Sequence, residues 1–564
     1  MVSGDSKVYT VADAIVKELV RAGVTVAYGI VSIHNMPIYD AILREGTIKL
    51  VCSRGESGAV NMADGHARST GELGVVITST GTGAGNAAGS LIEAWSAGVP
   101  LLHITGQVEA KYIGTGKGYI HECKNQLEML EGACKNAYEL KIPNQISSLM
   151  RKSIKQAFQV PSGPISIEIP IDYQSTIIDR FHLIDTFLDG ESKEKSYMIH
   201  SNVIEQITNA NRPVIWAGNG SILSNASNEV RELAEITGAL VITSQSAKGI
   251  VSEDNPCNIG HFGANPLTRE FINSADLLIS IGVRFRSNET SGYNVTVPEN
   301  HINIDADYLA VNRNYKTSYS LVGDIKPILS GINEQLKERK YEGTAKSYRD
   351  EIKQLKKVLH TGLRKTLGPY EEILDSMRKH LKEDFIFVRD VTVPANVWGS
   401  RLFEIREPRT SIHASGGGIG QGLPTAIGAQ IANMNKRVVL LAGDGGFMVN
   451  VGELATAAEE NIPMIILLFD DSGYGVLRNI QEAAYGRQVA VDLKSPNFTE
   501  LGSSLDIDTT TITSPEEFDK ALGKAVANNE LHIIVVDMNK VGPMAEKFSG
   551  PPGVAASFQP RKEK

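Results

Sequence analysis

The sequence predicts an α/β protein built from three doubly wound domains, each with a parallel sheet between layers of helices. Short, continuous apolar runs alternate with stretches of helical spacing and with glycine turns, as expected for strands that helices cover on both faces. Intervals rich in Lys, Glu and Asp separate three such series along the 564 residues. We therefore expect an N-terminal domain at residues 1–176, a central domain at 201–330, a C-terminal domain at 365–545 and a tail at 546–564.

The N-terminal domain is expected to begin with a helix over residues 10–22. Thr10 and Asp13 stand at capping-box positions, apolar residues follow at helical spacing, and Gly23 ends the helix. A short strand is expected at residues 25–30. The alternation of strand, helix and glycine turn then continues to about Asp172, which indicates a doubly wound sheet.

The central domain repeats this alternation between two charged intervals. These intervals, residues 177–201 and 334–369, have little strand pattern and are interpreted as linkers. A helical stretch at residues 345–358 inside the second one is interpreted as a solvated connecting helix. Strands of the central domain are expected at residues 213–217, 240–243, 277–281 and 302–304.

The C-terminal domain contains two polar turns, each directly after a buried strand. The strands are expected at residues 438–442 and 464–469, with a helix at 451–460 between them, so their carboxyl ends should lie side by side. Acidic side chains at such ends suit a hard cation, and turn glycines let backbone amides approach a phosphate. A Gly-Asp-Gly turn alone is more often only a solvated turn, but a second acidic turn 27 residues on (471 − 444) favours a site. The turn residues are Gly443, Asp444, Gly445 and Gly446, then Asp470 and Asp471.

Composition and charge argue against several classes of protein. A net charge of −9 without a basic run offers nucleic acid little to bind. No apolar run approaches the roughly 20 residues that span a bilayer, and no charged-then-apolar leader is present, so we expect no membrane association and a cytoplasmic protein. The cysteines lack a CxxC pair, which indicates a reduced intracellular protein without a zinc site; they are Cys52, Cys123, Cys134 and Cys257.

The pair of polar turns resembles the cofactor-binding signature of thiamine diphosphate (ThDP) enzymes. That signature begins with Gly-Asp-Gly and ends with Asn-Asn, where this chain has Asp470-Asp471. Further segments extend the resemblance, to the acetolactate synthase-like members of the family, over nearly the whole chain. They are RGESGAVNMADGHAR at 54–68, STGTGAGN at 79–86 and GGGIGQGLPTAIGA at 416–429.

The resemblance implies ThDP and Mg²⁺ as cofactors. It places the catalytic glutamate at Glu56, where a carboxyl group beside the pyrimidine N1′ favours the imino tautomer, a role that requires burial. It places Ile419 under the bent cofactor. Without the matching flanks, Glu56 would be an ordinary helix N-terminal charge and Ile419 a core isoleucine. The implied metal ligands are Asp444, Asp471 and the Gly473 carbonyl, and the implied cofactor contacts are Gly81, Asn86, Ser415, Gly416, Ile419, Gly443, Asp444, Gly445, Gly446, Asp471, Gly473 and Tyr474.

The expected substrate wall departs from the family pattern. Ile480 stands where acetolactate synthases have a tryptophan that helps to select the second 2-oxo acid, and residues 392–394 replace a Gln-His pair that contacts the diphosphate. His121 lies in a loop that faces substrate in relatives, although a satisfied surface histidine is an equally good interpretation. The candidate substrate-binding residues are His34, Asn35, His121, Leu477 and Ile480, with His121 also a catalytic candidate.

The implied reaction is decarboxylation of a 2-oxo acid followed by carboligation, with acetolactate from two pyruvates as the first choice. A non-ligating decarboxylase is the first alternative. A flavin-dependent oxidase and a ThDP-binding pseudoenzyme are ranked after it. Gly218, Gly220, Gly282 and Arg284 suit FAD or another nucleotide, but Arg286 replaces the acidic residue of flavin-binding relatives, so this ligand stays open. Glu56 and Ile419 belong to different subunits in the family, which implies at least a homodimer and commonly a homotetramer.

Overall fold

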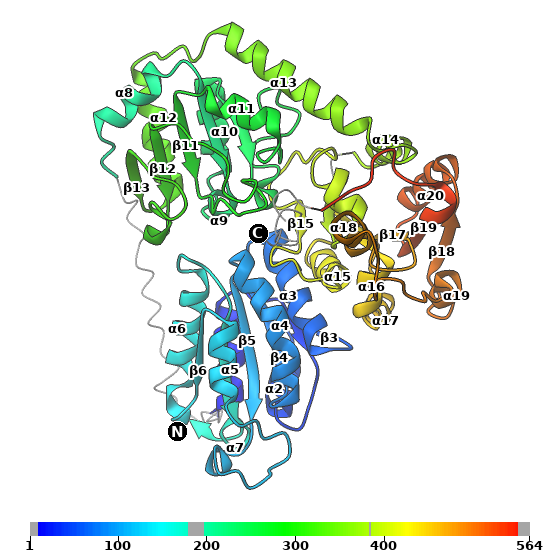
Figure 1. Ribbon diagram of the computed structural model, residues 1–564. Coiled ribbons are helices and arrows are strands. Elements are labelled where there is room, and N and C mark those ends of the chain that lie inside the picture. Colours follow the sequence, from blue (N-terminus) through cyan, green and yellow to red (C-terminus); the bar gives the residue numbers. More distant parts are fainter. Residues whose placement is uncertain (1–8, 179–196, 383–384, 551–564) are drawn as a thin grey trace, which may run out of the picture.

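The computed structural model describes residues 9–178, 197–382 and 385–550 (Figure 1). It contains three parallel-sheet α/β domains, as the sequence predicts. The N-terminal domain (blue to cyan in Figure 1) and the C-terminal domain (yellow to red) lie side by side, and the central domain (green) packs beside both. In the described part of the chain, no helix is both long enough and apolar enough to cross a membrane.

The N-terminal domain has six parallel strands in the order β3-β2-β4-β5-β7-β6. The expected first helix is α1 (Val11–Arg21), and its capping box is present: the Asp13 N–H donates to Thr10 Oγ1 and the Thr10 N–H donates to Asp13 Oδ2. A short antiparallel pair, β1 (Tyr9–Thr10) with β8 (Ile177–Ile178), closes the domain. The sheet strands are β2 (Val26–Gly29), β3 (Lys49–Cys52), β4 (Gly74–Thr78), β5 (Leu101–Gln107), β6 (Asn136–Glu139) and β7 (Ile165–Pro170); the remaining helices are α2 (Met36–Glu45), α3 (Glu56–Thr70), α4 (Thr82–Ala97), α5 (Gln126–Ala133), α6 (Ile146–Phe158) and α7 (Ile171–Gln174).

The central domain has five parallel strands in the order β10-β9-β11-β12-β13. Three strands match the expected ranges, and the fourth is one residue longer at each end. The edge strand β13 (Tyr319–Val322) was not expected, because it is short and half exposed and therefore lacks a continuous apolar run. The other elements are β9 (Pro213–Ala217), β10 (Leu240–Thr243), β11 (Leu277–Ile281), β12 (His301–Asp305), α8 (Ser201–Asn209), α9 (Asn219–Leu223), α10 (Ser227–Thr237), α11 (Pro266–Asn273) and α12 (Ile325–Glu338).

The expected connecting helix is α13 (Lys346–Arg364), which leads from the central domain toward the C-terminal domain (Figure 1). That domain has six parallel strands in the order β15-β14-β16-β17-β19-β18. The helix expected at 451–460 is shorter than predicted, and a separate helix precedes it. The elements are β14 (Phe385–Arg389), β15 (Ser411–His413), β16 (Arg437–Gly443), β17 (Ile465–Asp470), β18 (Asp508–Ile512), β19 (His532–Asp537), α14 (Tyr370–His380), α15 (Gly422–Ala432), α16 (Asp444–Val449), α17 (Glu453–Glu459), α18 (Gly475–Tyr485), α19 (Phe498–Ser503), α20 (Pro515–Ala527) and α21 (Met538–Val541).

Helices α3 and α15 join the N-terminal and C-terminal domains through reciprocal glycine contacts. A Cβ atom at Gly65 of α3 would lie 2.0 Å from the carbonyl oxygen of Thr425 in α15. A Cβ atom at Gly428 of α15 would lie 1.9 Å from the carbonyl oxygen of Met62 in α3. Each helix therefore needs a glycine where the backbone of the other passes, and the two domains are packed closely enough to fix the turns that precede both helices.

Candidate functional site

The two acidic turns meet at the carboxyl end of the C-terminal sheet. Strands β16 and β17 are paired in parallel, with Gly443 opposite Phe469, so Asp444 and Asp471 follow neighbouring strands as predicted. Asp444 is fully buried; its Oδ2 accepts a 2.7 Å hydrogen bond from Ser495 Oγ, and its Oδ1 accepts a 3.4 Å bond from the Asp471 N–H. The Gly473 carbonyl oxygen lies 3.0 Å from where a Gly445 Cβ would stand. The structure thus brings the three predicted ligands to one turn pair.

The electrostatics of this turn pair suit a cation. Burial and the neighbouring carboxylate of Asp444 raise the pKa of Asp471 to about 7, against the lowering effect of Arg478 3.5 Å away. Burial also raises the pKa of Asp470, with Asp444 adding to the effect. A divalent cation between the carboxylates would relieve this repulsion. Within the described ranges no three His, Cys, Asp or Glu residues are arranged to hold a metal, so such an ion would need main-chain or ligand oxygens as well.

The glycines of the first turn are needed by the protein's own packing. A Cβ at Gly445 would lie 2.8 Å from the ring of Tyr474, and one at Gly443 would lie 2.9 Å from Thr392 Oγ1. A Cβ at Gly446 would lie 3.3 Å from Asp390 Oδ2. These glycines allow the turn to pack against two neighbouring segments, and they also leave backbone N–H groups uncovered by side chains of their own.

Ile419 lies in a turn directly before α15 and is 40% exposed, so it is not a core isoleucine. Gly417 and Gly420 have φ values of +85° and +81°, which favour glycine. Upstream, the Ser415 and Gly416 N–H groups donate to the Glu93 carboxylate of the N-terminal domain. The turn therefore presents an apolar side chain outward from a backbone that hydrogen bonds hold in place.

Glu56 is the first residue of α3 and lies beside α4. Its Oε2 accepts a 3.1 Å hydrogen bond from Asn86 Nδ2, and a Cβ at Gly83 would lie 3.0 Å from its Oε1. The predicted glycine-rich loop at 79–86 is shorter than expected, because α4 already begins at Thr82. The burial that the glutamate's role requires is not provided within one chain, since Glu56 is only half buried on the surface of its domain. The physical reason is that Glu56 begins α3 and Asn86 lies in the second turn of α4, both beyond the carboxyl ends of the strands, where one chain leaves them partly open.

His34 and His121 lie together at the same end of the N-terminal domain. Their ring centroids are 5.2 Å apart, and a Cβ at Gly81, whose φ is +61°, would lie 2.2 Å from the His121 carbonyl oxygen. The His34 side chain is 1% exposed and its Nδ1 is buried without a hydrogen-bond partner. Burial, and then His121, lower the pKa of His34. His34 is therefore enclosed, whereas His121 is the exposed member of the pair.

The other predicted substrate residues differ in their surroundings. Asn35 is fully buried, and its amide is committed to the local turn, accepting from the Ser32 N–H and donating to the Ile30 carbonyl. Leu477 is 51% exposed on α18, which follows the second acidic turn. Ile480 lies on the same helix and is covered by the C-terminal segment, since a Cβ at Gly550 would lie 3.1 Å from its Cγ1. The candidate substrate residues therefore fall into two groups, one on the N-terminal domain and one on the C-terminal domain.

Sequence reasoning missed the polar residues that hold the Ile419 turn. Asp390 follows β14 and is 2% exposed, and its carboxylate accepts hydrogen bonds from the Gly420 and Gly422 N–H groups. Asn450 donates from Nδ2 to the Gly420 carbonyl at 2.6 Å. A charged residue directly after the buried run FIFVR was the available signal for Asp390. Glu93 gave no signal, because the Ser415 and Gly416 amides that it accepts from lie more than 300 residues away.

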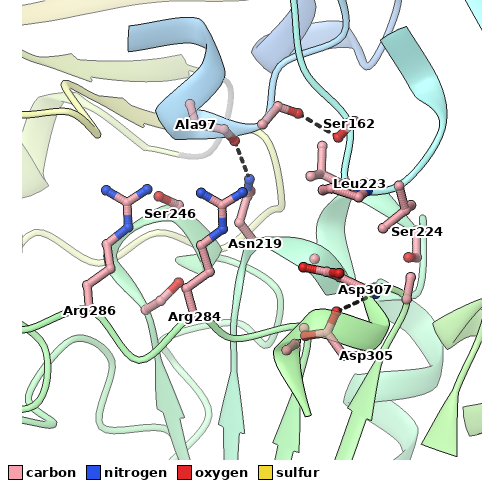
Figure 2. Close-up of a pocket in the computed structure, with 18 of the residues that line it drawn as sticks. Ala97, Ser162, Asn219, Leu223, Ser224, Ser246, Arg284, Arg286, Asp305 and Asp307 are labelled. Carbon is pink, nitrogen blue, oxygen red and sulfur yellow. Dashed lines mark hydrogen bonds between the residues drawn. The ribbon is translucent and has the colours of Figure 1, made fainter. Parts of the chain in front are cut away.

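A cavity of about 90 Å³, partly open to solvent, lies between the central and N-terminal domains at the carboxyl ends of β9, β11 and β12. Figure 2 shows Arg284 and Arg286 pointing toward the end of α4, and both donate to the Ser96 carbonyl. Arg286 also donates to the Ser415 carbonyl, so it joins three domains. Gly218, Gly220 and Gly282 pack on one another, since a Gly218 Cβ would lie 2.3 Å from the Gly282 oxygen. Backbone packing alone therefore explains these glycines, and the cavity's ligand is left open.

Paired carboxylates at adjacent strand ends, a glycine turn beside them and a glutamate on a second α/β domain are the arrangement that the resemblance to ThDP-binding enzymes implies. Comparison with known proteins agrees. Residues 9–129, 201–332 and 394–536 match the N-terminal TPP-binding, central and C-terminal TPP-binding domains of thiamine pyrophosphate enzymes.

Similarity to individual proteins extends over nearly the whole chain. The chain is 31% identical to a probable acetolactate synthase large subunit of Methanocaldococcus jannaschii, over 96% of this chain and 93% of that protein. It is 28% identical to the acetolactate synthase isozyme 2 large subunit of Escherichia coli, over 97% and 98% of the two chains, and 28% identical to the acetolactate synthase large subunit of Buchnera aphidicola, over 93% and 94%. The chain belongs to the thiamine pyrophosphate enzyme family and is a ThDP-dependent enzyme of the acetolactate synthase-like kind.

Proposed function

We propose that the enzyme decarboxylates a 2-oxo acid in a ThDP- and Mg²⁺-dependent reaction and joins the acyl unit to a second 2-oxo acid. The specific reaction proposed is the formation of 2-acetolactate and CO2 from two pyruvates. The observation that carries this proposal is the pairing of Asp444 and Asp471 at adjacent strand ends, in a chain similar over its length to acetolactate synthase large subunits.

The residues of the C-terminal domain would hold the cofactor. Asp444, Asp471 and the Gly473 carbonyl would bind Mg²⁺, and the ion would bind the diphosphate of ThDP. Bound ThDP would supply the carbon nucleophile that attacks the 2-oxo group and accepts the electron pair released with CO2. Ile419, exposed on its clamped turn, would support the cofactor from below. The turn glycines, with Tyr474 packed beside Gly445, would let backbone N–H groups approach the diphosphate.

The residues of the N-terminal domain would transfer protons and contact the substrate. Glu56 would share a proton with the pyrimidine N1′ of ThDP, and the Asn86 amide would orient the glutamate carboxylate. His34 and His121 would face the substrate at the same end of the domain and would hold or move a proton near its carbonyl oxygen. Burial lowers the pKa of His34 and disfavours its charged form, so His34 would contribute a hydrogen bond as a neutral ring.

We propose a homodimer as the smallest active unit and a homotetramer as the assembled form, with 2-oxo acids as small-molecule partners. The half-buried position of Glu56 supports this arrangement, because a second chain would supply the missing burial. Apolar side chains support it too, since Ile92 and Trp95 on α4, and Val449 near Ile419, are all more than half exposed. Such exposed apolar groups are typical of a surface that another chain covers.

A non-ligating 2-oxo acid decarboxylase is the second candidate, and the His34–His121 pair favours it, because a proton donor beside the acyl unit would release an aldehyde. A flavin-dependent oxidase would require FAD in the central cavity, which a visible spectrum of the purified enzyme detects. A ThDP-binding pseudoenzyme would release no CO2 from any 2-oxo acid.

Product analysis by NMR tests the proposed reaction and the effect of Ile480 on the choice of acceptor. We expect acetolactate from pyruvate alone. With equal pyruvate and 2-oxobutyrate, we expect little preference for 2-oxobutyrate as the acceptor, because the pocket lacks the indole that packs an ethyl group in acetolactate synthases. One methylene in an apolar pocket is worth about 1–3 kcal/mol of discrimination. A strong excess of acetohydroxybutyrate would contradict the interpretation of Ile480, and acetaldehyde as sole product would favour the non-ligating decarboxylase.

A further inference from the structure

Asp390 places a carboxylate inside the C-terminal domain, directly after β14. Its backbone N–H donates to the Leu441 carbonyl of β16 at 2.9 Å, which anchors the residue to the sheet. Its Oδ1 accepts from the Val391 N–H at 2.7 Å, and its Oδ2 accepts from the Gly420 N–H at 3.0 Å and the Gly422 N–H at 3.1 Å. The carboxylate thus connects the rigid sheet to the backbone on the C-terminal side of Ile419.

Burying a carboxylate in this position destabilises the folded state. Burial raises the pKa of Asp390 to about 6, although the three backbone hydrogen bonds oppose the rise. An apolar residue of similar size would avoid this desolvation cost. The hydrogen-bond partners of Asp390 explain why the fold keeps a buried carboxylate at this position.

The turn that carries Ile419 cannot hold itself in place. It contains four glycines, Gly416, Gly417, Gly418 and Gly420, two of them with positive φ, and glycine loses more conformational freedom on folding than any other residue. The exposed Ile419 side chain gains little from core packing. The position of this side chain therefore depends on backbone hydrogen bonds at the ends of the turn, from Glu93 on one side and from Asp390 and Asn450 on the other.

We propose that Asp390 is a positioning residue for the reaction, which sets the height of the Ile419 side chain beneath the cofactor by holding the Gly420 and Gly422 amides. The inference rests on the proposed function, because the role of Ile419 belongs to it. Asp390 touches neither substrate nor cofactor in this scheme. It acts on the rate of proton loss from the ThDP C2 carbon through the conformation that Ile419 imposes.

A double-mutant cycle tests this role. We would measure exchange of the ThDP C2 proton by NMR in deuterated water, and Mg²⁺-dependent ThDP binding by calorimetry, for Asp390→Ala, Ile419→Ala and the double variant. We expect each single variant to slow C2 exchange by up to ~100-fold, as a displacement of about 1 Å does in a preorganised site, while ThDP still binds. The double variant should be no slower than the slower single variant, because both changes remove the same support.

Two further variants control for stability. Asp390→Asn keeps one oxygen acceptor for the turn and should fold, with C2 exchange between those of the wild type and Asp390→Ala; it carries the test if the alanine variant is insoluble. Asp276→Ala removes another carboxylate that accepts two backbone N–H groups, from Asn211 and Arg212, just before the amino end of β11 in the central domain. It should lower the melting temperature and leave C2 exchange unchanged.

Two results would overturn the proposal while leaving the proposed function intact. One is wild-type C2 exchange in a folded Asp390 variant when Ile419→Ala is slow. The other is a double variant whose slowing equals the product of the two single effects. Wild-type exchange in Ile419→Ala would instead remove the assigned role of Ile419, and with it the role of Asp390.

Discussion

The N-terminal and C-terminal domains have the same strand order but carry different chemical groups at their strand ends. Numbered within each domain, the six sheet strands run second, first, third, fourth, sixth, fifth in both. The helices that follow the equivalent second strands, α3 and α15, pack against each other through reciprocal glycines. The two domains are therefore equivalent in architecture, and any difference in function arises from the residues at the strand ends.

Equivalent strand ends carry different groups. After the second strand, the N-terminal domain has Glu56 and the C-terminal domain has the Ile419 turn. After the fourth strand, Gln107 on one side corresponds in place to the Asp470–Asp471 turn on the other. Gln107 is neutral and bonds within its own domain, to Val108 and Glu168. In the proposed function, the C-terminal domain would supply the cation ligands and the N-terminal domain the proton-exchanging carboxylate of Glu56, so binding and proton transfer would be separated.

The largest expected effect comes from the cation ligands. Asp444→Ala removes a direct ligand and should weaken Mg²⁺-dependent ThDP binding by more than the roughly 10- to 100-fold that losing a ligand's hydrogen-bond partner costs. Calorimetry with and without Mg²⁺ measures this. Asp508→Ala is the matched control, because Asp508 lies at the amino end of a strand in the same sheet and pairs with Lys524 at 2.8 Å. Equal ThDP binding by Asp444→Ala and the control would show that the metal is held elsewhere.

Glu56→Gln should affect proton exchange at the cofactor rather than cofactor binding. The amide keeps the size of the side chain but cannot exchange a proton with N1′, so C2 exchange should slow by about 100-fold or more, as for other positioned acid–base groups. ThDP affinity should change little, since the proposed ligands of Mg²⁺ and the diphosphate lie on the other domain. Glu72→Gln, just beyond the far end of α3, controls for charge. If Glu56→Gln abolished ThDP binding instead, the separation of binding from proton transfer would be wrong.

Much of the fold was predictable because its signals are local. Buried parallel strands are continuous apolar runs, which is why β9, β10 and β11 were placed correctly. The acidic turns were predictable because neighbouring parallel strands place their carboxyl ends together. The edge strand β13 lacks such a run, so it was not predicted.

The supporting contacts of the site were not predictable, because they join residues far apart in the sequence. Glu93 holds the Ser415 and Gly416 amides across two domains, and no local pattern around Glu93 indicates a partner. The burial expected of Glu56 belongs to a site completed by a second chain, and the fold of one chain leaves that carboxylate half buried. Long-range contacts of this kind require the three-dimensional arrangement.

The smallest expected effect tests how closely the two domains are joined. Alanine usually stabilises a helix interior relative to glycine by about 1 kcal/mol, but Gly65→Ala would place a methyl group 2.0 Å from the Thr425 oxygen. We expect the helices to separate at a cost of about 1–3 kcal/mol, seen as a lower Tm in thermal unfolding. Gly428→Ala should act similarly, and the double variant should cost less than the sum, because one displacement relieves both clashes.

The matched control for this substitution is Gly132→Ala in α5, where a Cβ would meet no atom within 4 Å. It should raise the Tm slightly, since only the helix propensity changes. A Gly65→Ala protein as stable as this control would mean that α3 and α15 do not require the close approach. The turns before these helices, which carry Glu56 and Ile419, would then be fixed within their own domains rather than by the contact between them.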